Sequence, residues 1–451
     1  MFVKRVAELK LLEEQYASIG SNLVILYGRK GMGKTSLLTE FLSGKKAAYY
    51  YEGMECEDHL QFQLLRQQLI KGEESAPTLD NARLFSELIT EEAEKVVLVL
   101  DEFHYILKNG SSILEALQLL GHPNKPVMIV LCSSSIRWVE NEMLESLSGY
   151  ASYITAYMKL KDFTFVDFVN RFPVSSVETC IYINSILGGI PEYLDAWQES
   201  QSVKDNIKTI LLNKNSGLNN APQQFLKLEL REPAVYNTIL YYLAMGNRKL
   251  NELHARTGYS RAKISVYIKN LIQLDIVEKL VPLGDEGREN AQKGLYRIKD
   301  NFLCFWYRFV FPNTSELMLG RIDKVYDQCI APYLDQYIGE YFADVCTEFL
   351  KLMNLHNRLP ANFMWWDRWY GKNGTIDIMA QSADKKTLIG RCLWDEANVM
   401  PQDYLSLLAL AEEAKVIPDY CYLFSKKGFS DELRQMTEGR DDIHLIGLVD
   451  F

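Results

Sequence analysis

One stretch of the sequence combines residue types and spacing that suit the binding of a nucleotide phosphate. Residues 28–35 read GRKGMGKT and fit G-x-x-x-x-G-K-[ST], the pattern of a phosphate-binding loop. The glycines let the backbone curl so that successive N–H groups point at one anion, and the start of a helix adds unpaired N–H donors. Lys34 is placed to reach the β- and γ-phosphates, and the Thr35 hydroxyl to bind Mg²⁺. The candidate nucleotide-binding residues are therefore Gly28, Arg29, Lys30, Gly31, Met32, Gly33, Lys34, Thr35 and Ser36.

A pair of acidic residues supplies the second part of this predicted chemistry. In VVLVLDEFHY, residues 96–105, five apolar residues precede Asp101 and Glu102. Such a run predicts a central parallel strand, and ligands bind beyond the carboxyl ends of such strands. Asp101 is then placed to hold Mg²⁺, and Glu102 to polarise an attacking water. Taken without the phosphate loop, the same pattern would indicate a strand that ends in solvated acids.

A third apolar run also ends in polar residues. VMIVLCSSS, residues 127–135, predicts another buried strand. The serines at its end are candidates to sense a γ-phosphate, and we select Ser134 for this role. The alternative is that Ser133 and Ser134 simply end the strand.

These candidate residues need a parallel sheet to bring them together. Further strands are predicted at residues 23–27, 47–52 and 153–160, and helices alternate with the strands. The sequence therefore predicts an α/β fold in which residues 1–163 form a P-loop NTPase core.

Composition narrows the class of protein. The chain has 451 residues, which predicts two to four domains, and its formal net charge is −10, so nucleic-acid binding would need a local basic patch. The 8 cysteines include no C-x-x-C pair and the 6 histidines no H-E-x-x-H motif, so we expect neither a zinc site nor a disulfide framework. The charged amino-terminal stretch lacks the apolar core of a signal peptide, and no apolar run approaches 18 residues. We expect a cytoplasmic protein without a membrane contact.

With these motifs in place, the chain resembles the additional-strand P-loop ATPases and, more narrowly, the archaeal-type AAA/STAND ATPases. The matching stretches are FVKRVAEL at residues 2–9, DEFHY at 101–105, LGGIPEYL at 187–194 and a winged-helix segment described below. The resemblance implies that Phe2, Arg5 and Pro191 lie near the adenine. The residue pattern at 188–191 by itself indicates only that one helix stops and the next begins.

The sequence departs from this family at one position that bears on hydrolysis. Where the family carries a Gly-Arg pair after the third strand, this chain has Gly149 followed by Tyr150. An arginine at the transition state contributes roughly 10³- to 10⁵-fold to the rate of such enzymes. We therefore expect slow hydrolysis. Arg137 and Arg171 are substitutes that nothing in the sequence singles out.

Two helical segments follow the predicted core. Residues 164–228 resemble the helical lid of such ATPases, and residues 229–300 predict three helices and a two-stranded wing, with a Thr-Gly turn typical of a helix-turn-helix. The third helix presents basic and aromatic side chains suited to duplex DNA, but the wing tip, residues 284–294, mixes acidic and basic residues. DNA contact and protein contact both remain open. The candidate DNA-binding residues are Arg261, Lys263, Tyr267 and Lys269.

The carboxyl-terminal part begins with an aromatic connector, residues 301–336. Residues 337–451 predict the order helix, strand, strand, helix, strand and resemble a PD-(D/E)xK endonuclease domain. Asp377 matches the first carboxylate of that site, but Arg391 and Leu393 stand where the glutamate and lysine belong. We therefore expect a degenerate domain that binds or scaffolds and does not cleave. Two further positions support this view, because Ala343 stands where a helix glutamate is usual and Glu396 lies beyond the predicted strand. Four tryptophans are expected in the core or in an interface: Trp365, Trp366, Trp369 and Trp394.

Together these features predict an ATP-binding protein and Mg²⁺-dependent ATPase that hydrolyses ATP to ADP and phosphate. ATP would bind between the sheet and the lid, and the lid and winged helix would change their arrangement with the nucleotide, as in a two-state switch. One alternative is a DNA-binding factor in which ATP controls the winged-helix contact. Another is a nucleotide-stabilised scaffold with little hydrolysis. We expect a monomer or small oligomer with a protein partner that the sequence does not specify.

Overall fold

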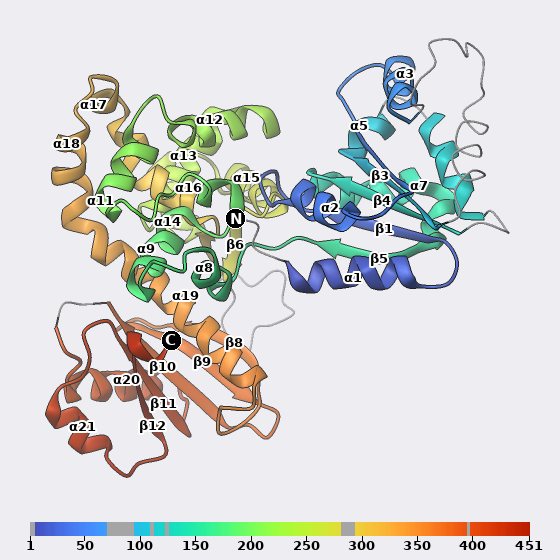
Figure 1. Cartoon of the computed structure of the whole chain (residues 1–451). Coiled ribbons are helices and arrows are strands. Elements are labelled where there is room, and N and C mark those ends of the chain that lie inside the picture. The colour runs from blue at the N-terminus through green and yellow to red at the C-terminus, as the bar shows by residue number, and fades with distance from the viewer. Residues whose placement is uncertain (1–4, 70–93, 109–111, 122–125, 281–293, 395–396) are drawn as a thin grey trace. The chain divides into compact units, whose positions relative to one another are not determined.

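The computed structural model describes residues 5–69, 94–108, 112–121, 126–280, 294–394 and 397–451. The chain divides into two compact units, Met1–Asp162 and Phe163–Phe451 (Figure 1). The predicted Phe2 and Glu396 lie outside the described residues, as does most of the wing tip. Each unit is described by itself.

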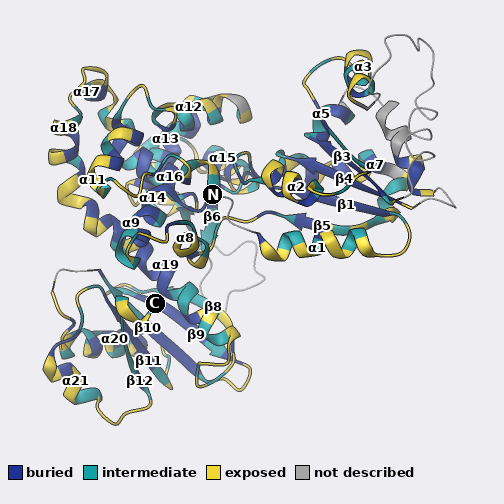
Figure 2. Cartoon of the chain, viewed as in Figure 1, coloured by how far each residue is buried: buried dark blue, intermediate teal, exposed yellow. Residues whose placement is uncertain are grey.

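The first unit is built on a parallel sheet of five strands in the order β2-β3-β4-β1-β5. Strands β1, β3 and β4 are buried along their whole length, as the dark blue ribbons of Figure 2 show. Strand β4 lies between the phosphate-loop strand β1 and the acidic strand β3. The predicted α/β P-loop fold is thereby confirmed. The strands are β1 (Asn22–Tyr27), β2 (Ala48–Glu52), β3 (Val96–Asp101), β4 (Val127–Ser133) and β5 (Ile154–Lys159).

Helices connect these strands because each parallel pair needs a crossover. Apolar residues from the strands and from α5 and α6 form one core, in which Phe103 and Leu100 are almost fully buried. The helical elements of this unit are α1 (Val6–Ala17), α2 (Lys34–Leu42), α3 (Asp58–Leu69), α5 (Phe103–Lys108), η1 (Ser112–Gly121), α6 (Ile136–Asn141), α7 (Met143–Leu147) and η2 (Ser148–Tyr153).

Besides an apolar cluster from Ile376 to Ile443 in its carboxyl-terminal part, the second unit has a large hydrophobic core that runs from Phe165 to Phe424. The segments predicted as lid, winged helix, connector and endonuclease-like domain all contribute to it. The lid and connector are helical: α8 (Phe165–Arg171), α9 (Val177–Leu187), α10 (Pro191–Leu194), α11 (Val203–Asn206), η3 (Ile207–Leu212), α12 (Gly217–Glu229), α16 (Asn301–Phe305), η4 (Trp306–Val310), η5 (Phe311–Asn313), α17 (Thr314–Met318), α18 (Ile322–Val325), η6 (Tyr326–Ile330) and η7 (Ala331–Tyr333).

The winged-helix segment has the predicted order of elements. Gly258, in the left-handed conformation with a φ of 72°, ends α14, and Ser260 caps the next helix by accepting from the Lys263 N–H. The elements are α13 (Pro233–Ala244), α14 (Leu250–Thr257), α15 (Arg261–Gln273), β6 (Val277–Leu280) and the antiparallel β7 (Leu295–Ile298).

The carboxyl-terminal part is an α/β domain with a mixed sheet in the order β12-β11-β10-β9-β8. The predicted order of elements was incomplete, since it missed strands β8 and β12 and helix α21. Strand β8 holds Trp365, Trp366 and Trp369, whereas Trp394 is buried in the core. The elements are α19 (Leu334–Leu355), β8 (Phe363–Tyr370), β9 (Thr375–Ser382), β10 (Thr387–Leu393), α20 (Pro401–Glu413), β11 (Tyr420–Ser425), α21 (Asp431–Thr437), β12 (Ile443–Gly447) and η8 (Leu448–Asp450).

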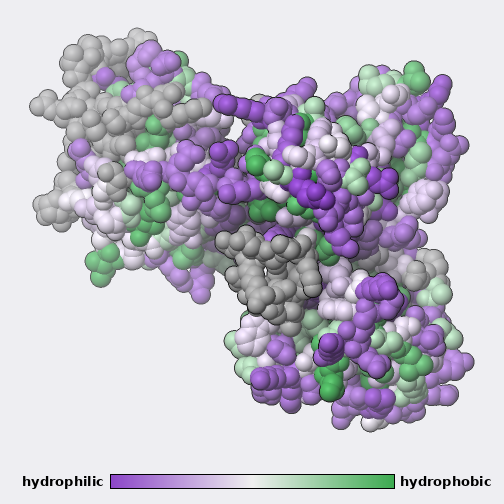
Figure 3. Space-filling model, turned by 180° about the vertical axis from the view of Figure 1, so that it is seen from behind, coloured by the Kyte–Doolittle hydropathy of each residue, from purple (hydrophilic) through white to green (hydrophobic). Residues whose placement is uncertain are grey.

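Among the helices of the described residues, none is both long and apolar enough to cross a bilayer. On the face shown in Figure 3, hydrophilic residues cover most of the coloured surface, and hydrophobic residues form small separate areas among them.

Candidate functional site

The phosphate loop joins β1 to α2 in the conformation that its sequence predicts. Gly33, with a φ of 80°, lies in the left-handed region directly before Lys34, the first residue of α2. A side chain at Gly28 would meet the Leu160 carbonyl oxygen at 3.1 Å, so the turn leaves no room for one. Glycine is thus required at Gly33 by backbone conformation and at Gly28 by close approach.

Two cationic side chains donate hydrogen bonds to backbone carbonyl oxygens of the phosphate loop. The Lys34 ammonium, 6% exposed, donates to the carbonyl oxygens of Gly28 at 2.8 Å and Arg29 at 3.1 Å. Arg5, 8% exposed, donates to the carbonyl oxygens of Met32 at 3.0 Å and Lys161 at 2.9 Å. The loop is therefore fixed on both sides, and the Lys34 ammonium lies at the point where the loop curls.

Asp101 lies at the carboxyl end of β3 and is almost fully buried, at 3% exposure. Its Oδ2 accepts from the Thr35 hydroxyl at 3.3 Å and from the Tyr50 hydroxyl at 2.6 Å. Its Oδ1 accepts from the Glu102 N–H at 2.8 Å. The structure thus brings the two predicted Mg²⁺ residues, Thr35 and Asp101, into direct contact.

Glu102 has an unusual backbone conformation for a residue with a side chain. Its φ of 47° lies in the left-handed region. Its Oε2 accepts from the Ser134 N–H at 3.0 Å and the Ser134 hydroxyl at 2.7 Å, and His104 Nδ1 lies 3.4 Å away. His104 Nδ1 also lies 3.0 Å from the Ser133 hydroxyl. The two serines thus belong to one polar group around Glu102.

The donor set of this site fits Mg²⁺. A hydroxyl and a carboxylate oxygen are hard ligands, and Mg²⁺ usually takes one or two protein oxygens together with phosphate oxygens and water. Among the described residues, no group of three or more His, Cys, Asp or Glu side chains is placed to hold a metal by itself. A metal site at Thr35 and Asp101 would therefore depend on a bound nucleotide to complete it.

The remaining predicted site residues lie in several places. Lys30, Thr35 and Ser36 are exposed, as expected for groups that meet a ligand. Pro191 begins α10 in the second unit, so its relation to the adenine remains a prediction. The two arginines considered as substitutes for the missing catalytic arginine belong to different units. Arg137 lies on α6 of the first unit, and Arg171 of the second unit forms an ion pair with Asp195 at 2.7 Å.

Sequence reasoning missed Tyr50 and His104. Tyr50 lies inside a predicted strand of three consecutive tyrosines, where nothing distinguishes it from its neighbours. His104 follows Glu102 by two residues, and this proximity was the available signal.

On the winged helix, only part of the predicted basic set is free to meet a ligand. Arg261 is exposed and donates to Asn251 at 2.7 Å, and Lys269 is exposed on the same helix. Lys263 lies over the rings of Tyr259 and Tyr267, at 4.8 and 5.6 Å from their centroids. The Tyr267 hydroxyl in turn donates to Glu232. The exposed cations of α15 are therefore Arg261 and Lys269.

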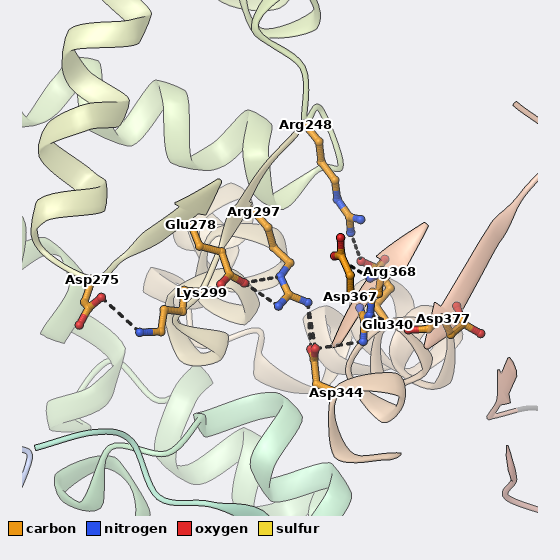
Figure 4. A network of polar contacts seen from close by, with 10 residues as sticks. All are labelled: Arg248, Asp275, Glu278, Arg297, Lys299, Glu340, Asp344, Asp367, Arg368 and Asp377. Atoms are coloured by element: carbon orange, nitrogen blue, oxygen red, sulfur yellow. Dashed lines mark hydrogen bonds and ion pairs between the residues drawn. The ribbon is translucent and has the colours of Figure 1, made fainter. Parts of the chain in front are cut away.

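The endonuclease-like site is occupied by guanidinium groups (Figure 4). Arg368 donates to Asp344 at 3.0 Å and to the Asp377 carbonyl oxygen at 3.1 Å. Arg297, from β7, donates to Asp344 at 2.9 Å. The helix carboxylate of this site is thus Asp344, one residue beyond the buried Ala343 that the sequence comparison had considered.

The Asp377 carboxylate is also occupied. It accepts from the Cys392 N–H at 2.9 Å. Burial raises the pKa of Asp377. Two arginines on Asp344 and a desolvated Asp377 do not fit a divalent cation, which prefers several ionised carboxylates.

Three family models match separate stretches of the chain. Residues 2–196 match a family described as an ATPase domain predominantly from Archaea. Residues 237–279 match the arsR family of bacterial regulatory proteins, and residues 306–404 match a family of archaeal and bacterial proteins of unknown function.

Two relatives come from Methanocaldococcus jannaschii. An uncharacterized protein is 28% identical over 400 residues, which is 88% of this chain and 88% of that one. An uncharacterized ATP-binding protein is 50% identical over 46 residues, which is 10% of this chain and 78% of that protein.

Among solved structures, the Aeropyrum pernix ORC2 protein in its ADPNP–ADP complexes has a TM-score of 0.45 at 15% identity, covering 71% of this chain and 95% of that one. A STAND protein with a tetratricopeptide repeat sensor from Pyrococcus horikoshii has a TM-score of 0.29 at 15% identity, covering 78% and 50%. The phosphate loop, the parallel sheet and the family matches show a P-loop ATPase domain similar to those found predominantly in Archaea, followed by a winged helix and a further α/β domain.

Proposed function

We propose that this chain binds ATP with Mg²⁺ at residues 28–36 and hydrolyses it slowly to ADP and phosphate. The observation that carries this proposal is the 3.3 Å contact between Thr35 and Asp101 at the carboxyl end of the parallel sheet, beside the phosphate loop. Mg²⁺, when bound, would neutralise charge on the phosphates.

Each residue of the site has a task that follows from its contacts. The Lys34 ammonium exchanges the carbonyl oxygens of Gly28 and Arg29 for phosphate oxygens. The N–H groups at the start of α2 face the same anion. Asp101 accepts from Thr35 and so orients the hydroxyl that would bind the metal.

Glu102 is proposed to act on the attacking water. In this structure Ser134 occupies its Oε2 with two hydrogen bonds. These bonds engage Oε2, so the other oxygen, Oε1, is the one that would accept a proton from water. The tyrosine at position 150 in place of an arginine supports a slow enzyme.

Nucleotide binding and hydrolysis are separable by mutation. Lys34→Ala removes the lysine that is placed to reach the β- and γ-phosphates, so ATP affinity should be lost. Glu102→Gln keeps the loop intact, so it should bind ATP and lose turnover. Lys46→Ala, on the exposed turn after α2, is the matched control. ATP affinity measured by calorimetry and phosphate release measured at saturating ATP would test both. Equal ATP affinity in the original chain and Lys34→Ala would refute the proposed site.

We further propose that the nucleotide state is passed from the first unit to the second, as in a two-state switch. Such a switch requires ATP and ADP to favour different arrangements. Hydrogen exchange of residues 163–451 in Glu102→Gln should then differ between ATP and ADP. Identical exchange in the two states would leave a nucleotide-stabilised scaffold as the function, especially if phosphate release by the original chain does not exceed that of Glu102→Gln.

The carboxyl-terminal domain is proposed to bind or scaffold without cleaving nucleic acid. The support is the pair of guanidinium groups on Asp344 together with Arg391 and Leu393 at the metal-site positions. Incubation with duplex DNA and Mg²⁺ or Mn²⁺ should leave the DNA intact. Cleavage that is lost in Asp377→Asn would contradict this.

A second candidate function is binding of duplex DNA through α15, favoured by the exposed Arg261 and Lys269 and by the match to a regulatory-protein family. Phosphate contacts make affinity depend on salt with a slope near −0.9 for each contact. The double variant Arg261→Ala, Lys269→Ala should weaken binding of the full chain and reduce the slope by about 2. Lys204→Ala, Lys208→Ala is the control, because both lysines pair with carboxylates on another surface of the second unit.

A further inference from the structure

Strand β2 brings a tyrosine hydroxyl to the metal side of the candidate site. Tyr50 pairs with Val99 in the parallel register, so its side chain stands beside the end of β3. Its hydroxyl donates to Asp101 Oδ2 at 2.6 Å, shorter than the 3.3 Å contact from Thr35 to the same oxygen. Tyr50 is thus the closer of these two donors to that oxygen.

The two hydroxyls reach Asp101 Oδ2 from different elements, since Thr35 lies on α2 and Tyr50 on β2. If the Thr35 hydroxyl turns toward a metal, the bond from Tyr50 still holds this oxygen.

We propose that Tyr50 is a positioning residue that holds the Asp101 carboxylate in the orientation needed for Mg²⁺. This inference rests on the proposed nucleotide site. Groups that bond to a metal's ligands typically change metal affinity by about 10- to 100-fold when removed. Tyr50 acts through Asp101, and its hydroxyl also interacts with the side chain of Thr35, the other predicted metal ligand.

The adjacent residue provides a matched control. The Tyr51 hydroxyl donates to the backbone carbonyl oxygen of Gln61 at 2.9 Å and to its Oε1 at 2.6 Å. Successive residues of a strand point to opposite faces, so Tyr50 and Tyr51 bond to different partners from one strand. Tyr51→Phe and Tyr50→Phe each delete one hydroxyl from β2, and only the second faces Asp101.

The test measures metal binding directly as well as activity. Purified full-length chain with bound ADP is titrated with Mn²⁺, and free Mn²⁺ is followed by electron paramagnetic resonance. ADP affinity is measured in parallel with EDTA present. Tyr50→Phe should weaken Mn²⁺ binding by about 10-fold and leave metal-free ADP affinity unchanged. Tyr51→Phe should keep the original Mn²⁺ affinity, even where its thermal unfolding temperature falls.

Each result decides the matter. Equal Mn²⁺ affinity in Tyr50→Phe and the original chain, or an equal loss in both tyrosine variants, would overturn the positioning role while ADP binding stands. Should Tyr50→Phe fold poorly, Tyr50→His is the alternative variant, because its ring N–H replaces the tyrosine hydroxyl as a donor. It should bind Mn²⁺ more tightly than Tyr50→Phe and less tightly than the original chain. Failure of the original chain to bind ADP would overturn the proposed function itself, which is a distinguishable outcome.

Discussion

At the scale of single residues, Arg5 has a role that its contacts define more sharply than its family resemblance. The resemblance places it near the adenine, but in the structure its guanidinium bonds to the carbonyl oxygens of Met32 and Lys161. These bonds tie the phosphate loop to the end of β5. These contacts favour a role for Arg5 in positioning the proposed phosphate-binding loop, and its place near the adenine remains a prediction.

This distinction gives a prediction. Arg5→Met should weaken ATP and GTP binding by a similar factor, about 10-fold, because losing bonds from a charged group costs about 1.5–3 kcal/mol and both nucleotides use the same loop. If Arg5 instead contacted the adenine, Arg5→Met would weaken ATP binding more than GTP binding and so reduce the preference for ATP. Calorimetric titration of both nucleotides distinguishes the two, and Lys10→Met, on the exposed face of α1, is the control.

At the scale of elements, strand β7 of the wing is joined to helix α19. Arg297 bonds to Glu278 at 2.6 Å within the wing and to Asp344 at 2.9 Å on α19 (Figure 4). The wing strands are therefore held against the carboxyl-terminal domain, and a DNA contact by this segment would depend on α15.

Removing this ion pair should destabilise the second unit. Burial favours the neutral form of Asp344, but Arg368 and Arg297 outweigh it and lower the pKa of its carboxyl below the ordinary 3.8. The ionised Asp344 carboxylate therefore contributes its full stabilisation of the fold above about pH 4. This stabilisation is lost as the pH falls through the lower pKa that Asp344 has in the folded state. Asp344→Asn should cost about 1–3 kcal/mol at pH 7, since the side chain is 39% exposed and solvent weakens the pair.

Urea unfolding of Asp344→Asn at pH 7 and pH 3 would test this, because the difference from the original chain should shrink at pH 3. Asp323→Asn is the control, because Asp323 forms an ion pair with Lys208 but is 83% exposed. An effect of Asp344→Asn that is equal at the two pH values would show that the carboxylate charge is not responsible.

The elements were also where sequence reasoning succeeded and failed most clearly. Strands β1, β3 and β4 are buried throughout, and each contains an unbroken run of at least five residues with apolar side chains, which predicts a buried strand. Strand β8 alternates aromatic, charged and apolar residues, and no such pattern marked it as a strand. Contacts between distant segments, such as Arg297 with Asp344, depend on tertiary packing and leave no trace in local sequence. The same reason hid Tyr50, whose partner lies 51 positions away.

At the scale of the whole molecule, the division into two compact units, each with its own large hydrophobic core, predicts two unfolding events. The core of the first unit holds Leu23 and Leu100, and the core of the second runs from Phe165 to Phe424. Residues in one cooperative core unfold together, whereas separate cores can unfold at different temperatures. Calorimetry of the full chain should therefore resolve two transitions.

Nucleotide should act on these transitions unequally. A ligand at 100 times its dissociation constant stabilises its binding unit by about 2.7 kcal/mol. Mg²⁺ with ADP should therefore raise the transition of the first unit, and Lys34→Ala should abolish this rise. Asp344→Asn should lower the other transition and so identify it. A switch that couples the units predicts that ADP and a non-hydrolysable ATP analogue move the second transition by different amounts, because only a conformation that distinguishes the two nucleotides can carry that difference. A second transition that stays fixed with both nucleotides would confine their effect to the ATPase unit and favour the scaffold.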